Sequence, residues 1–277
     1  MIGAYSGLAC THFFRGDFES TRQHARQGVQ IWRSGGVQSY AEDVDTPVVS
    51  CLCYGAHSEW HLGEIASCRT AMAEAILLAK DLKDRNTLAL ALNWALNLAY
   101  SERNPAEVDR LASQMIELST RHHFVYWLAL GAIARGWARS ASGDTAEGIA
   151  WIEQGIEDYR ATGWVLGLPY HLAQKAEVLY LEDHSSEALE AIKEAEKVIE
   201  RSEERQWCAE LHRLRGVFLT AMGAEKTQIE ASFCEAIRIA KKQKSVSLEK
   251  RAEATYAAYR RQKVGALGEH GIRLPLW

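Results

Sequence analysis

A short turn recurs six times along the chain at an almost constant spacing, and this repeat constrains the fold more than any other feature. The turns are Arg15-Gly16-Asp17, Leu62-Gly63-Glu64, Arg103-Asn104-Pro105, Ser142-Gly143-Asp144, Glu182-Asp183-His184 and Met222-Gly223-Ala224. Counted from the middle residue of each turn, the spacings are 47, 41, 39, 40 and 40 residues. Each turn follows an apolar stretch with helical spacing and precedes an amphipathic one, which predicts a series of helical hairpins.

Small residues recur at two fixed offsets from these turns. Seven residues before the middle of each turn stand Ala9, Ala56, Asn97, Gly136, Ala176 and Gly216. Twelve residues after it stand Gly28, Ala75, Ile116, Gly155 and Ala195, and with one inserted residue Ala236. Glycine inside a helix costs about 1 kcal/mol relative to alanine, so we expect Gly136, Gly155 and Gly216 to lie where two helices approach too closely for a side chain. Ile116 departs from the pattern and predicts a third hairpin that is splayed or shifted.

The two offsets are typical of helix–turn–helix repeats of the tetratricopeptide (TPR) type. We therefore predict an all-α protein, with a right-handed superhelix of six hairpins and a capping helix over residues 1–262 as one solenoid domain, and a tail over 263–277. First helices are expected near 2–14, 47–61, 87–102, 125–141, 169–181 and 207–222, second helices near 17–33, 64–82, 105–121, 144–161, 185–202 and 225–242, and the capping helix near 246–262. The longest irregular segment, 34–47, accounts for the longer first spacing. The apolar end of the tail is expected to fold back onto the last helix or dock elsewhere, with disorder as the alternative.

Composition narrows the class of protein further. The 277 residues carry a net charge of −4, which provides no electrostatic attraction for nucleic acid or for anionic membranes. No apolar run approaches the roughly 20 residues that span a bilayer. The cysteines stand in apolar, helical contexts, and the first residues lack the pattern of a signal peptide. We therefore expect reduced core residues at Cys10, Cys51, Cys53, Cys68, Cys208 and Cys234. These features predict a cytoplasmic protein with neither nucleic-acid nor membrane partners.

Three segments of the repeat resemble a known group of proteins. They are DTPVVSCLCYGAHSEWHLG, WLALGAIARGWARSASGDTAEGIAWIEQGIEDYRATG and CAELHRLRGVFLTAMG. They look like the TPR region that ends large bacterial signalling proteins with an AAA/STAND-type ATPase, often preceded by a class III adenylate cyclase or a winged-helix DNA-binding domain. The layout, over roughly residues 1–262, is similar to the sensor region of the maltose-regulon activator family. The resemblance implies a sensing scaffold, either a fragment of such a protein or a stand-alone relative, since the chain has no Walker A pattern and no recognisable cyclase metal site.

No catalytic or metal-binding arrangement is recognisable in the sequence. There is no nucleophile elbow, phosphate-binding loop or carboxylate pair beside a base, so we expect neither an enzyme nor a cofactor. His57 and His61 stand four residues apart on one helix face, a spacing that suits zinc, but no third ligand is indicated. We interpret them as a groove-lining pair or a hydrogen-bonded interhelical pair, and expect no metal. His122 and His123 are expected at the surface or at the C-terminal cap of a helix.

Aromatic and charged residues recur on the face of the first helices that we expect to line the concave side of the superhelix. Offsets of 13, 10, 6 and 3 residues before the middle of each turn select this set, which comprises His57, Trp60, Trp94, Trp137, Tyr170, Glu177, Tyr180, Glu210 and Arg213. Such a mixture is typical of surfaces that bind peptides or helices, where Trp, Tyr and Arg dominate the binding energy. The alternative for each tryptophan is packing against the neighbouring repeat. Tyr170 and Glu210 lie near helix starts and are expected to be exposed.

Two asparagines of the third hairpin, Asn93 and Asn97, lie on its buried stripe, and we expect them to bond to each other or to contact a ligand. The function that these features favour is a non-enzymatic scaffold whose groove binds a peptide or protein segment, including one from a parent's own ATPase or cyclase domain. The alternative is a small-molecule sensor that controls an attached ATPase, cyclase or DNA-binding domain, because aromatic side chains also stack on sugars and rings.

Overall fold

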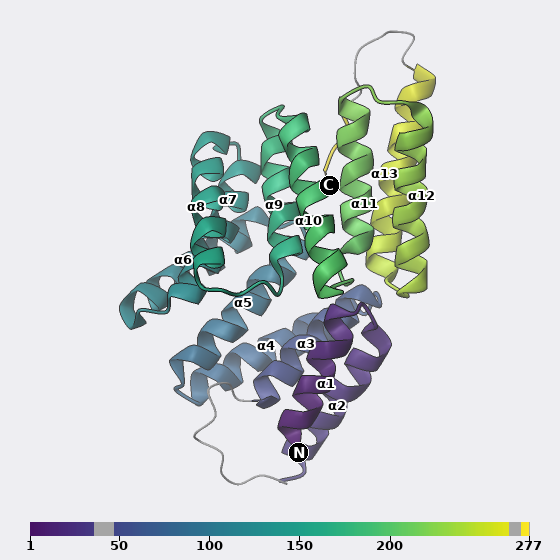
Figure 1. The fold of residues 1–277 in the computed structure, drawn as a ribbon. Coiled ribbons are helices and arrows are strands. Elements are labelled where there is room, and N and C mark those ends of the chain that lie inside the picture. The colour runs from purple at the N-terminus through teal and green to yellow at the C-terminus, as the bar shows by residue number, and fades with distance from the viewer. Residues whose placement is uncertain (36–46, 266–272, 277) are drawn as a thin grey trace.

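The computed structural model describes residues 1–35, 47–265 and 273–276, without the side chains of 263–265. In this part of the chain there are thirteen helices and no strand (Figure 1). They are α1 (Ile2–Phe14), α2 (Phe18–Arg33), α3 (Pro47–His61), α4 (Ile65–Asp81), α5 (Arg85–Ser101), α6 (Pro105–His122), α7 (Val125–Ala141), α8 (Thr145–Ala161), α9 (Leu168–Leu181), α10 (Ser185–Ser202), α11 (Cys208–Ala221), α12 (Lys226–Lys242) and α13 (Val246–Gly265). Their bounds lie within two residues of those expected, except that α13 continues to Gly265. Most of the irregular segment 34–47, and Trp277, lie outside the described residues.

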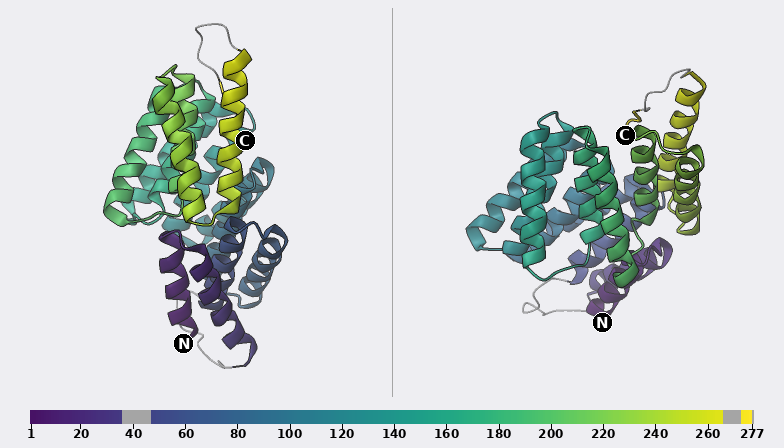
Figure 2. Two further views of the ribbon diagram at one scale, coloured as in Figure 1. Left: turned by 90° about the vertical axis from the view of Figure 1, so that its right-hand side faces the viewer. Right: turned by 45° about the horizontal axis from the view of Figure 1, so that its top comes forward.

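Successive helices pair as hairpins that stack into a right-handed superhelix of the TPR-like kind (Figures 1 and 2). In the described part of the chain, each odd-numbered helix from α1 to α9 contacts the next odd-numbered one. The backbones of the even-numbered helices approach only those of their neighbours in sequence, and ion pairs such as Arg33–Glu74 and Arg160–Glu194 link α2 to α4 and α8 to α10 along the surface. The odd-numbered helices therefore form the inner layer and the even-numbered ones the outer layer, which confirms the predicted fold class. The grouping of residues 1–262 as one domain stays a prediction.

All six hairpin turns close the first helix in the same way. One residue adopts the left-handed conformation, with φ between 58° and 100°: Gly16, Gly63, Arg103, Gly143, Asp183 and Gly223. Its N–H bonds to the carbonyl three residues earlier, and the following N–H bonds to the carbonyl five residues earlier, as in a Schellman-type C-cap. In the third turn this residue is Arg103. Taking Asn104 as the middle was wrong by one residue, because Asn104 caps α6 by accepting a hydrogen bond from the Glu107 N–H.

With Arg103 as the middle of the third turn, every spacing between turns except the first is 40 residues. The repeat positions of the third hairpin move by one residue as well. They become Leu96 and Met115, both buried and both large, so the exception lies there instead of at Asn97 and Ile116. Ile116 packs against the next hairpin, where a Cβ added to Gly131 would lie 2.9 Å from its Cγ1. A glycine in α7 thus makes room for the bulk at position 116.

Glycines lie where α7 and α8 nearly touch. A Cβ at Gly136 would lie 2.7 Å from both the Gly148 carbonyl oxygen and the Ile152 nitrogen. A Cβ at Gly155 would lie 2.8 Å from the Ile133 nitrogen. In α11, a Cβ at Gly216 would lie 2.7 Å from the Phe233 ring of α12. Since real Cβ atoms do not approach backbone atoms this closely, no larger residue fits here without a shift of the helices.

The two ends of the array meet, so that the superhelix closes on itself. The N–H groups of Arg205 and Gln206, in the loop before α11, donate to the Phe14 carbonyl oxygen at 2.6 and 3.2 Å. His61 of α3 shares a 2.8 Å hydrogen bond with the Ser245 hydroxyl, just before α13. Figure 1 shows the lower end of α13 beside the first hairpins, and α13 contacts α3. The last helix therefore packs across the inside of the array as well as capping its end.

The described part of the tail docks on α9. Tyr180 donates a hydrogen bond to the Leu274 carbonyl oxygen at 2.8 Å, and the Arg273 guanidinium bonds to the Tyr180 carbonyl oxygen at 2.9 Å. Leu274 and Leu276 are buried. Residues 273–276 therefore dock on a helix other than the last one, which is one of the alternatives expected for the tail.

The cysteines differ from expectation. All six are free, but Cys51, Cys53 and Cys68 alone are fully buried. Cys10 and Cys208 are half-buried, and Cys234 is exposed. Cys234 belongs to α12, a helix of the outer layer, where half of the surface faces solvent, so its apolar neighbours in sequence do not imply burial.

Candidate functional site

The inner layer encloses a cavity of about 650 Å³ near the centre of the superhelix. Helices α1, α3 and α5 form one side, and the start of α7, the loop 162–167 and the start of α9 form the other. Gln206 and Trp207, held against α1 by the closure described above, complete the wall. The volume lies within the usual range for ligand sites, roughly 300–1,000 Å³.

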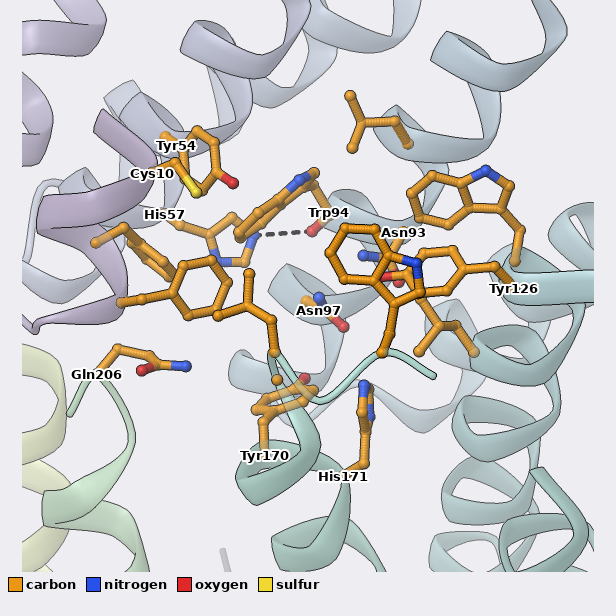
Figure 3. A pocket seen from close by; sticks show the side chains of 18 of the residues that line it. Cys10, Tyr54, His57, Asn93, Trp94, Asn97, Tyr126, Tyr170, His171 and Gln206 are labelled. Atoms are coloured by element: carbon orange, nitrogen blue, oxygen red, sulfur yellow. Dashed lines mark hydrogen bonds between the residues drawn. The ribbon is translucent and has the colours of Figure 1, made fainter. Parts of the chain in front are cut away.

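Aromatic rings line much of the cavity. Trp94 forms edge contacts with Tyr54 and His57, each with 4.8 Å between ring centroids, and with Phe13 at 5.3 Å. On another wall, the rings of Tyr170 and Trp207 meet edge-on at 5.2 Å. Figure 3 shows rings from both halves of the array around one space. Aromatic walls of this kind offer both stacking and edge contacts to a ligand.

The lining carries no formal charge. None of the described residues that line the cavity is Asp, Glu, Lys or Arg. Burial lowers the pKa of His57 to about 4 and that of His171 to about 4, and burial also lowers the pKa of His61 well below its usual value. These three buried histidines are therefore neutral at pH 7, and the buried part of the lining carries no charge. The fourth lining histidine, His123, is exposed.

Several polar groups on the lining residues have no partner. The Tyr170 hydroxyl and the Trp207 Nε1–H are buried without a hydrogen bond, and so is the Gln206 Oε1. Asn93 and Asn97 face the cavity from α5, half-buried (Figure 3). The predicted hydrogen bond between them is absent from the described residues, and ligand contact, the other alternative, stays a prediction. A buried polar group without a partner costs roughly 1–3 kcal/mol, so these atoms favour a ligand that pairs with them.

The structure divides the predicted groove residues into two groups. His57, Trp94 and Tyr170 line the cavity. The others are buried away from it: Trp60, Trp137, Glu177, Tyr180, Glu210 and Arg213. The expected exposure of Tyr170 and Glu210 is wrong, since they are 9% and 1% exposed. The reason is closure, because α13 and the loop before α11 cover the helix starts that an open superhelix would leave bare.

Glu177 is the acceptor at the centre of a buried polar cluster beside the cavity. It accepts hydrogen bonds from the Tyr100 hydroxyl at 3.0 Å and from Trp137 Nε1 at 2.7 Å. Its ion-pair partner lies in a turn: Arg103 reaches it at 2.7 Å. This contact explains why a residue other than glycine holds the left-handed position of the third turn.

Glu210 joins three guanidinium groups in the same cluster. Arg103, Arg213 and Arg251 lie 2.6, 2.7 and 3.2 Å from its carboxylate. Burial by itself raises the pKa of Glu210, but the guanidinium groups, Arg213 foremost, outweigh it and hold that pKa well below the usual range. Burial lowers the pKa of Arg251 to about 10, which still leaves it charged at pH 7. Glu210 and Arg213 thus have a structural role in joining α11 to α13.

The histidine pair of α3 is also structural. His57 Nε2 donates to the Trp94 carbonyl oxygen at 2.8 Å (Figure 3), and His61 stacks on Phe18 with 3.6 Å between centroids. In the described part of the chain no group of three His, Cys, Asp or Glu residues is placed to hold a metal ion. His123 is the left-handed C-cap of α6, with φ of 58°. A cap was one of the two positions expected for it.

Sequence reasoning missed several lining residues. Phe13 and Cys10 stand three and six residues before the first turn, offsets that were not read for that hairpin. Trp164 and Trp207 come from loops, for which the repeat gives no offset. Tyr126 lies at the start of α7, outside the four offsets that were read.

Comparisons with known proteins agree with the fold. A family model described as anaphase-promoting complex subunit 5 matches residues 50–102, which is less than half of the chain. An uncharacterized protein, R02095, of Rhizobium meliloti (strain 1021) is 25% identical over 197 residues, which cover 71% of this chain and 19% of that protein. The match thus spans about a fifth of the length of this relative.

Three solved structures have the same overall shape. The Rap conjugation gene regulator of the plasmid pLS20, in complex with the Phr* peptide, has a TM-score of 0.64 at 11% identity over 94% of this chain and 74% of that one. The apo form of RapI has a TM-score of 0.58 at 11% identity, over 96% and 99%. PlcR of Bacillus thuringiensis, in complex with the peptide PapR7 and DNA, has a TM-score of 0.55 at 14% identity, over 96% and 100%. At these identities the likeness shows the fold, a TPR-like helical repeat. In the described part of the chain, no helix combines the length and apolar character needed to cross a bilayer.

Proposed function

We propose that this chain is a regulatory scaffold without catalytic activity that binds a peptide or protein segment in its central cavity. The observation that carries the proposal is the cavity itself: about 650 Å³, walled by aromatic rings and holding buried hydrogen-bonding groups without partners. A packed core leaves few such voids and few such atoms unpaired. The arrangement is therefore that of a binding site.

The comparisons support the choice of a peptide. A Rap regulator and PlcR, which share the fold, are each in complex with a peptide. PlcR is also in complex with DNA, so the likeness lends no support to the expectation that nucleic acid has no part here. A cytoplasmic location and the absence of a membrane partner stay predictions.

A small-molecule sensor that controls an attached domain is the second candidate. The observation in its favour is that the cavity also has the size of a metabolite site. The match to one fifth of a longer relative is compatible with a chain that works beside further domains, such as the ATPase, cyclase or DNA-binding domain of the proteins it resembles.

A selection from a random peptide library tests the proposal. Asn93→Phe fills the cavity without breaking a hydrogen bond, and Gln154→Phe places the same ring on the exposed surface of α8 as a matched control. We expect selected peptides to bind the wild type and Gln154→Phe equally and to lose at least tenfold in affinity for Asn93→Phe. Selection of no peptide, or binding that Asn93→Phe leaves unchanged, would refute the proposal.

A metabolite screen by thermal shift separates the second candidate from the first. A metabolite at 100 times its Kd adds about 2.7 kcal/mol to the free energy of unfolding. Stabilisation by such a compound in the wild type, lost in Asn93→Phe, together with an empty peptide selection, would favour the sensor.

A further inference from the structure

We infer that the cavity takes an uncharged peptide segment, which places a backbone amide beside Tyr170 and Trp207 and an apolar side chain among the rings. This inference rests on the proposed function and adds the charge and the hydrogen-bonding groups of the ligand. Three features carry it: the neutral lining, the unpaired polar atoms, and an exposed apolar lip at the mouth.

The first feature is charge. A charged ligand group would find no opposite charge on the described lining residues. Burial of an unpaired charge is strongly unfavourable, so such a group would lose its water without compensation. The polar cluster behind Tyr100 and Tyr170 holds three guanidinium groups against the two carboxylates of Glu177 and Glu210, which leaves one positive charge in excess. This excess disfavours a cation in spite of the aromatic walls. It attracts an anion, but the arginines do not line the cavity, so a buried anion would meet only neutral donors there.

The second feature is the set of unpaired polar atoms. The Tyr170 hydroxyl and Trp207 Nε1–H are donors, and Gln206 Oε1 is an acceptor. The rings of Tyr170 and Trp207 are in contact, and Gln206 precedes Trp207, so the three groups belong to one wall. A peptide unit carries both a carbonyl acceptor and an N–H donor, so it can pair with a donor and with the acceptor of this set. Figure 3 shows Asn93 and Asn97 reaching into the same space from α5, where they offer both kinds of group to a second peptide unit.

The third feature favours a chain over a compact molecule. Val125 and Trp164 line the cavity and are also 68% and 55% exposed, so they form its mouth. Val165, beside Trp164, is 59% exposed. This apolar lip, which comprises Val125, Trp164 and Val165, continues the binding surface outward from the cavity. A segment longer than the cavity would cover it, whereas an enclosed small molecule would leave it bare.

Three tripeptides with the same side chains test the inference. They are acetyl-Ala-Phe-Ala-amide, which is neutral, Ala-Phe-Ala-amide, with a free amino group, and acetyl-Ala-Phe-Ala, with a free carboxylate. Titration calorimetry at pH 6.5 keeps both termini charged in the latter two, given α-amino pKa values of about 7.7–8.0. We expect submillimolar binding of the neutral probe and at least tenfold weaker binding of each charged one. Acetyl-Phe-amide, which lacks the flanking units, is expected to bind at least fivefold more weakly than the neutral tripeptide.

Two indole variants locate the contact. Trp207→Phe removes the unpaired donor and keeps a ring, and we expect it to weaken the neutral probe at least fivefold. Trp151→Phe is the matched control, because the Trp151 Nε1–H donates to Glu147 on α8, away from the cavity. We expect it to leave the affinity unchanged. If Trp207→Phe does not fold by circular dichroism, Tyr170→Phe removes the other donor.

The outcomes separate this inference from the proposed function. Equal or tighter binding of a charged probe, still sensitive to Trp207→Phe, overturns the inference and leaves the scaffold proposal standing. Neutral binding that neither donor variant weakens overturns the amide contact. Acetyl-Phe-amide as tight as the tripeptide overturns the peptide segment in favour of a small amide. Failure of every probe to bind at a concentration of about 10 mM, well above the submillimolar Kd expected for the neutral probe, also overturns the inference. The library selection judges the scaffold proposal by itself.

Discussion

Substitution of Gly136 by alanine tests whether α7 and α8 touch as closely as the structure shows. The added Cβ would lie 2.7 Å from the Gly148 carbonyl oxygen, 2.7 Å from the Ile152 nitrogen and 2.9 Å from the Ile152 Cβ. Two of these neighbours are backbone atoms, which no rotamer change can move, so the helices must separate. Overpacking of this kind costs about 1–3 kcal/mol, and the better helix propensity of alanine returns about 1 kcal/mol. We expect a net loss of up to about 2 kcal/mol in the free energy of unfolding.

Gly7→Ala is the control for this substitution. Gly7 lies inside α1, and a Cβ there would meet nothing within 4 Å. The higher helix propensity of alanine is then not offset by a steric clash, and we expect the free energy of unfolding to rise by about 0.5–1 kcal/mol. Urea unfolding followed by circular dichroism at 222 nm measures both changes. The reasoning is refuted if Gly136→Ala raises the urea midpoint, as Gly7→Ala is expected to do, or if Gly7→Ala lowers it as much as Gly136→Ala.

Two further predictions concern buried ionisable groups. His57 and His171 have pKa values of about 4 in the fold, against about 6.5 in an unfolded chain, so the unfolded chain binds more protons between these values. The free energy of unfolding should therefore fall as the pH falls from 6.5 to 4, by at most about 3 kcal/mol for each histidine. His171→Gln should flatten the curve of urea midpoint against pH. An unchanged slope in this variant would contradict the claim that His171 is buried and neutral. Glu210→Gln leaves three guanidinium groups facing one remaining carboxylate, that of Glu177, and should cost about 3–5 kcal/mol by urea unfolding. Because the pKa of Glu210 is lowered in the fold, its contribution to the free energy of unfolding is present above the unfolded-state pKa of about 4.3 and is lost as the pH falls below it. If Glu210→Gln unfolds at the wild-type urea midpoint at pH 7, the stabilising role of Glu210 is refuted.

The fold follows from local features of the sequence, and the site does so only in part. Turn spacing and helical periodicity are properties of short segments, so the helix bounds were predictable to within two residues over most of the chain. The third turn was misread because Asn104-Pro105 looks like a turn, whereas the left-handed residue is Arg103, held by its contacts with distant carboxylates. No local pattern reveals such contacts.

The same limit applies to the groove residues. Offsets from the turns identified the inner face, and His57, Trp94 and Tyr170 do line the cavity. Trp60 stands at an equivalent offset, but Arg251 of α13 lies over its ring at 5.5 Å. Tyr180 is likewise covered by the tail, with the Arg273 guanidinium 5.1 Å from its ring. Which part of the inner face stays open depends on how the ends of the array meet, and that is set by contacts between residues far apart in sequence.

The indole N–H signals of the nine tryptophans give the most direct test of the central claim that the cavity is the binding site. In a protein labelled with ¹⁵N-tryptophan, Trp207→Phe and Trp151→Phe assign two of these signals. The Trp207 Nε1–H is unpaired in the free protein, so addition of acetyl-Ala-Phe-Ala-amide should move its signal downfield as it gains a carbonyl acceptor. The Trp151 signal should stay in place. Movement of Trp151 with Trp207 unchanged would put the ligand on the outer layer and contradict the claim.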